Sequence, residues 1–141
     1  MAPMSKEALV AAVKTAVSLS RAGNHEDAFV AYGKLYASPG FMDNRPEDQR
    51  QALKLLILAK RPGMKNTENL FQAHRAALEP LTELVSRYNE PEDYEMLGTC
   101  HALLGNEKSA AAILRQGIDI ERGRNAGSDL CGSMMTRLSA L

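Results

Sequence analysis

The sequence predicts an all-α protein. Ala and Leu, which favour helices, supply 20 and 18 of the 141 residues, whereas the strand-favouring residues Val, Ile and Thr together supply 14. Apolar residues recur at helical spacing in about seven segments, which Gly, Pro or Asn residues separate. The length suits one domain, so we predict a single domain, 1–141, of antiparallel helix hairpins joined by short loops.

The first hairpin is expected at about 5–38. Ser5 is a suitable N-cap for its first helix, because a serine hydroxyl can accept a hydrogen bond from a free backbone N–H. Gly23 and Asn24 tolerate the left-handed conformation and so can end that helix before the second begins. Pro39, next to a glycine, then breaks the second helix.

The remaining elements are a second hairpin at about 43–88, a third at about 91–122 and a final helix at about 128–140. Pro46 suits the first position of a helix in the second hairpin. The apolar pattern of this helix continues to Ala59, and the residues 61–63, Arg-Pro-Gly, are expected to stop it. Pro80 interrupts an apolar pattern in the same hairpin, and it either kinks one long helix or begins a new one. The sequence leaves both alternatives open.

The net charge of zero hides a segregation of charge. The 17 basic and 17 acidic residues balance, which argues against a dedicated nucleic-acid binder. Residues 45–75 nevertheless carry a net charge of +4 and residues 76–107 a net charge of −6. The longest apolar runs have five residues, so no membrane insertion is expected. The N-terminal residues show no secretory pattern and the two cysteines no disulfide pattern, which predicts a cytoplasmic protein.

No constellation of residues indicates catalysis. His25, His74 and His101 are far apart in the sequence, and no spacing typical of metal ligands occurs. Cys100 and His101 are adjacent, but neighbouring residues of a helix point about 100° apart and cannot form a local nucleophile–base pair. We therefore expect a protein that is not an enzyme and that holds no metal or cofactor.

An internal repeat points to a family. The sequence Gly-Asn followed four residues later by Ala occurs at 23–28 and again at 105–110. Together with helix hairpins of similar length, this pattern resembles the tetratricopeptide repeat (TPR) family, a right-handed helical solenoid. The third hairpin matches best, the first less well, and the middle hairpin exceeds the family period by roughly 14 residues. The final helix resembles the capping helix of such arrays. The family positions that the third hairpin matches are Tyr94, Leu97, Gly98, Ala110 and Leu114.

The resemblance implies that the first helix of each hairpin lines a concave groove for a peptide or helix of a partner protein. The groove would have an apolar floor, a basic shoulder and an acidic end, which suits an amphipathic helix or an extended segment with acidic residues. The alternative is that these charges only form a solvated face. The family's clamp for chaperone C-termini is not matched. With Gly63 taken as the residue that closes the first helix of the middle hairpin, the family pattern also covers Val10, Ser20, Ala102 and Leu103. The expected groove residues are Val13, Lys14, Val17, Arg21, Arg50, Leu53, Lys54, Ile57, Lys60, Arg61, Glu92, Glu95, Met96 and Thr99.

The function expected from the sequence is that of a non-catalytic protein–protein interaction module, an adaptor or assembly factor. The alternative is a small TPR-type chaperone that holds a client of a secretion system or a membrane complex. A homodimer is also possible, because the seven methionines include an adjacent pair, Met134 and Met135, that could form an adaptable contact surface.

Overall fold

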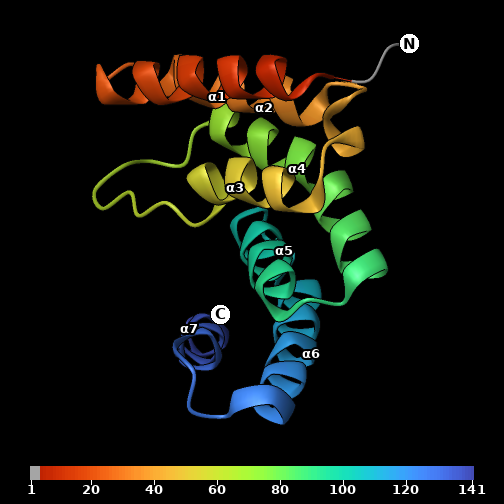
Figure 1. The fold of residues 1–141 in the computed structure, drawn as a ribbon. Coiled ribbons are helices and arrows are strands. Elements are labelled where there is room, and N and C mark those ends of the chain that lie inside the picture. The colour runs from red at the N-terminus through yellow and green to blue at the C-terminus, as the bar shows by residue number, and fades with distance from the viewer. Residues whose placement is uncertain (1–3) are drawn as a thin grey trace. The chain divides into compact units, whose positions relative to one another are not determined.

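The computed structural model describes residues 4–141, and all of its regular elements there are helices. Its contacts divide the chain into two units, Met1–Pro80 and Leu81–Leu141, and each unit is described by itself. The prediction of an all-α protein is therefore confirmed (Figure 1). The elements are α1 (Lys6–Arg21), α2 (His25–Ala37), the 3₁₀ turn η1 (Phe41–Asp43), α3 (Pro46–Ile57), α4 (Glu68–Tyr88), α5 (Pro91–Leu103), α6 (Glu107–Asn125) and α7 (Asp129–Ser139).

Two hairpins share the loop geometry that the repeated Gly-Asn pair predicts. Gly23 has φ +85°, and the N–H groups of Gly23 and Asn24 donate to carbonyls in the last turn of α1 at 3.1 and 2.9 Å. Gly105 has φ +83°, and it and Asn106 repeat both bonds at the end of α5 at 3.1 and 2.9 Å. This is the Schellman arrangement, in which a left-handed residue lets the free carbonyls of a helix end find donors. The local repeat in the sequence is therefore a repeat in the structure.

The first unit has a core of apolar side chains from all of its helices. Tyr36 of α2 stacks on Tyr32 and meets Phe41 edge-on, with ring centroids 6.0 and 5.6 Å away. Its hydroxyl donates to the Ala52 carbonyl of α3 at 2.9 Å, so this buried phenol is satisfied. Buried Gln49 donates to the carbonyls of Met42 and Asn44 at 3.2 and 2.7 Å and so closes the turn before α3.

The first half of α4 is attached to α2 by a polar contact. Thr67 and Asn69 donate to the two carboxylate oxygens of Glu26 at 2.9 and 3.3 Å. Leu70, Ala73 and other apolar residues of the helix are buried. Pro80 lies within α4, which is one continuous helix, so the alternative of a separate helix that begins there is wrong.

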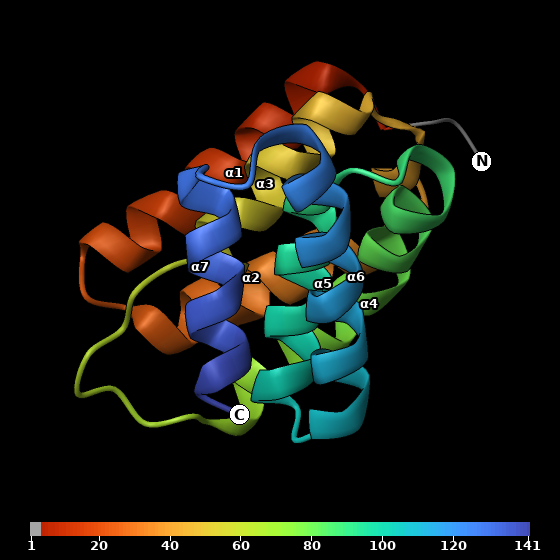
Figure 2. The same ribbon diagram turned by 90° about the horizontal axis from the view of Figure 1, so that it is seen from below.

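The second unit is built around α5, which pairs with α6 and also contacts α7 (Figure 2). Two glycines allow the close approach of these helices. A Cβ atom on Gly98 would lie 2.7 Å from Leu114 Cγ, and one on Gly117 would lie 2.7 Å from Tyr94 Cβ and 2.8 Å from Met134 Sδ. Both positions therefore require glycine for packing. The cluster that holds α7 consists of Leu114, Ile118, Cys131 and Met134, with Leu130 and Leu138 packed against it.

Two helix boundaries differ from the prediction. α6 continues to Asn125, although a turn was expected from Gly123, and an ion pair of 2.9 Å between Arg124 and Glu90 joins its last turn to the start of α5. α3 ends at Ile57, earlier than its apolar pattern suggested. Along residues 4–141 we find no helix with both the length and the apolar character needed to cross a bilayer.

Candidate functional site

The first unit has an apolar groove of about 220 Å³ between α1 and α3. The floor includes Leu9 and Ala52, which are 4% and 2% exposed, and the walls include Val10 and Leu55, which are 41% and 43% exposed. Large aliphatic side chains at this exposure leave apolar surface in water, which favours the docking of another apolar group. The groove is lined by Lys6, Leu9, Val10, Val13 and Lys14 of α1 and by Asp48, Gln51, Ala52 and Leu55 of α3.

The groove forms because α1 and α3 each carry apolar side chains beyond those that are buried in the core. On α1, Leu9 and Ala16 are buried, whereas Val10 is exposed and Val13 half-buried. These two valines are three residues apart and therefore share a face of the helix. On α3, Leu55 is the exposed member of an otherwise buried apolar run.

The polar rim of the groove is basic on α1. Lys6 and Lys14 are both exposed, and within residues 4–141 neither forms an ion pair. Asp48 and Gln51 supply the polar side chains of the α3 wall. The groove therefore combines an apolar strip with charged edges, the arrangement that helix-in-groove recognition uses.

A second groove, of about 290 Å³, lies in the second unit and includes Thr99 of α5 and Arg137 of α7 among its lining residues. Close to it, Glu95 of α5 is only 6% exposed. Its carboxylate accepts hydrogen bonds from the Ser133 hydroxyl and, at 3.1 Å, from Arg137 Nε. This acidic side chain thus attaches α7 to α5 and is not displayed to solvent.

The predicted groove residues fall into three groups in the structure. Val10, Val13 and Lys14 line the groove of the first unit, and Thr99 and Ala102 line that of the second. A second group is buried or already engaged in the folded chain: Leu53, Ile57, Met96, Arg50, Lys54, Glu92, Glu95 and Arg61. A third group lines neither groove: Val17, Ser20, Arg21, Lys60 and Leu103. The predicted residues belong to two units, so one continuous groove stays a prediction.

The register expected for the middle hairpin is wrong. It took Gly63 as the residue that closes the helix, but α3 ends at Ile57, and Gly63 lies in the following loop with φ +74°. The end of α3 is capped instead by Arg61, whose guanidinium donates to the Leu56 carbonyl at 2.8 Å, and burial lowers the pKa of this arginine. Counting back from Gly63 selected buried residues of α3 and missed Leu55, whose apolar character was the available signal.

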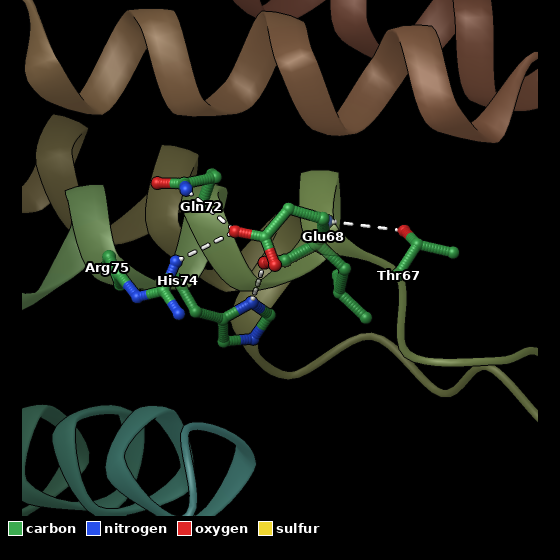
Figure 3. Close-up of polar contacts among 6 residues, drawn as sticks. Thr67, Glu68, Gln72, His74 and Arg75 are labelled. Carbon is green, nitrogen blue, oxygen red and sulfur yellow. Dashed lines mark hydrogen bonds and ion pairs between the residues drawn. The ribbon is translucent and has the colours of Figure 1, made fainter.

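The three histidines occupy separate environments. His74 is fully buried on α4, and its Nδ1 donates to the Leu70 carbonyl at 2.9 Å (Figure 3). Burial lowers the pKa of His74 to about 4, the hydrogen bond to Leu70 partly opposes this, and the positive charge of Arg61 adds to it. Next to it on the helix surface, Glu68 accepts from Gln72 at 2.8 Å and pairs with Arg75 at 3.2 Å.

Burial disfavours the charged forms of His101 and Cys100. His101 is half-buried, which lowers its pKa, and its Nδ1 lies 3.2 Å from the Asn106 side-chain amide. Cys100 is fully buried, and burial raises the pKa of its thiol to about 12, which disfavours the nucleophilic thiolate. In the described part of the chain no three His, Cys, Asp or Glu side chains lie close enough to hold a metal ion.

Comparison of the chain with protein-family models, with curated proteins and with solved structures finds no match.

Proposed function

We propose that this protein is a non-catalytic, TPR-like interaction module of the cytoplasm, and that it binds an apolar segment of a partner protein in the α1–α3 groove. The observation that carries the proposal is the groove itself, in which Val10 and Leu55 are more than 40% exposed beside a buried apolar floor. Apolar anchors that fill such a depression supply most of the binding free energy in helix-in-groove complexes.

Two further features support a repeat architecture. The α1–α2 and α5–α6 hairpins have the same hydrogen-bonded loop, and Ala28 and Ala110 are 1% and 0% exposed at equivalent places after it. Small residues there allow the helices of each hairpin to pack closely. The family's Leu-Gly pair also has a packing role in this chain, because Gly98 lies directly against Leu114.

The test is a comparative capture experiment with a matched control. The groove variant carries Val10→Glu and Leu55→Glu, and the control carries Val30→Glu, at an apolar residue of α2 that is 38% exposed and lies outside the groove. We expect a partner that the wild type and the control retain and the groove variant loses, with helicity by circular dichroism unchanged in all three. Retention of every partner by the groove variant would contradict the proposal.

A further inference from the structure

The two edges of the α1–α3 groove differ in charge. On α1, Lys6 and Lys14 are eight residues apart, which places them about 12 Å apart along the helix axis. Both are exposed, and nothing in the described chain pairs with them. A helix in the groove would therefore meet two available ammonium groups along one of its sides.

The opposite edge has a different character. α1 and α3 run in the same direction (Figures 1 and 2), and Lys6 and Asp48 both lie in the first turn of their helices. At this end of the groove a lysine and an aspartate occupy opposite walls. Towards the other end, Lys14 on α1 lies in the part of the groove where α3 contributes Leu55. The positive charge is therefore uncompensated at the Lys14 end.

We propose that the groove takes an amphipathic helix whose edge towards α1 carries acidic residues and whose edge towards Asp48 does not. This inference rests on the proposed function and names the chemistry of its partner. Opposite charges on the rim of an interface steer encounter and fix orientation, whereas the apolar strip between them supplies the affinity. A partner with basic residues on both edges would meet Lys6 and Lys14 with like charge.

The second unit shows the same mode of contact inside the chain. There α7 packs its apolar residues against α6 and satisfies a charge on α5 through the Glu95–Arg137 ion pair of 3.1 Å. A helix is thus held by an apolar face with a charge pair beside it. On the α1 edge of the groove, Lys6 and Lys14 could supply the basic residues of such ion pairs, and a partner would supply the acidic residues.

The probe is a displayed library of helical peptides of 16 residues, the length of α1, with leucine fixed on one face and the flanking positions randomised. The library is selected on the wild-type protein and then measured against three variants. The charge variant carries Lys6→Glu and Lys14→Glu. Its control carries Lys34→Glu and Lys108→Glu, which change the net charge equally at exposed sites outside the groove. The groove variant is Val10→Glu with Leu55→Glu.

We expect the selected peptides to carry Asp or Glu on one edge only, and to bind the charge variant about tenfold more weakly while the control binds as the wild type does. The selected peptides could instead show no preference for acidic residues and fail to bind only the groove variant. That result would overturn this inference and leave the proposed function standing. No binders, or binders that the groove variant retains, would overturn both. Self-association of the wild type that the groove variant abolishes would assign the groove to a second copy and overturn the inference.

Discussion

Acidification should destabilise the fold through one buried histidine. His74 is 0% exposed, and burial lowers its pKa from 6.5 to about 4. In the unfolded chain the imidazole is solvated and takes up a proton at its ordinary pKa. Between these two pKa values the unfolded state binds more protons than the folded state, so stability rises with pH across this window.

The magnitude follows from the pKa difference. One pKa unit corresponds to about 1.4 kcal/mol, so the change from 6.5 to about 4 costs about 3 kcal/mol. Above pH 6.5 the buried histidine does not lower the free energy of unfolding. As the pH falls below 6.5 this free energy decreases progressively, and the decrease reaches its full size of about 3 kcal/mol once the pH is below the pKa of His74 in the folded state. Typical domains have about 5–15 kcal/mol of stability, so this loss is large enough to measure.

The assay is urea unfolding, followed by circular dichroism, of the wild type, His74→Gln and the control His25→Gln between neutral pH and pH 4. We expect the free energy of unfolding of the wild type and of His25→Gln to fall by about 3 kcal/mol more than that of His74→Gln. The carboxylates and His101 are present in all three proteins. Their contributions to the pH dependence of stability therefore cancel when each protein is compared with His74→Gln. Equal pH dependence of His74→Gln and the wild type would refute the reasoning.

Three further predictions concern packing and chemistry in the second unit. Gly117→Ala should destabilise the protein by about 1–3 kcal/mol in thermal unfolding, because its Cβ would overlap neighbouring side chains. Gly123→Ala in the same helix, with no neighbour within 4 Å, should instead stabilise it by up to about 1 kcal/mol, and equal effects of the two would count against the packing described. Glu95→Gln should weaken the protection of α7 in hydrogen exchange, whereas Glu90→Gln, which breaks an exposed pair, should leave α7 unchanged; unaltered protection in both would disprove the attachment. Cys100 should resist iodoacetamide in the folded protein and react only after unfolding, as mass spectrometry would show, and prompt labelling of the native chain would contradict its burial.

The parts of the fold that the sequence predicts well are those that local chemistry determines. Gly23 and Gly105 have positive φ at the expected helix ends, and Ser5 and Ser128 cap the helices that follow them, with hydrogen bonds of 3.0 and 3.1 Å. Each of these features depends on residues within one turn of the helix. The positions of these helix ends therefore follow from spacing and capping.

The candidate site was less predictable because it depends on contacts between distant residues. Burial of Glu95 requires α7, whose Ser133 and Arg137 are about forty residues away in the sequence, and no local pattern signals that contact. The charge segregation suggested that one end of the groove is acidic. In the structure the Glu95 carboxylate instead binds Ser133 and Arg137 within the second unit. Charge counted by segment therefore shows where ionisable groups are, and only the fold shows which of them remain available.

The middle hairpin explains why the sequence could locate a groove on α1 but not on α3. For α1 the helix end is marked by a glycine at C′, Gly23. The pattern on α1 selects Val10, Val13 and Lys14, which line the groove, and also Val17 and Arg21, which do not. For α3 the cap comes from Arg61, a side chain four residues past the last helical residue, and such a cap has no required spacing from the helix. Residue positions counted back from a C′ glycine can be compared between one hairpin and the next. Positions counted back from a side-chain cap cannot, because the distance from the cap to the helix end varies. Under the proposed function, the residues of α3 that would face a partner must therefore be chosen by exposure, and Leu55 is the exposed apolar residue of that helix.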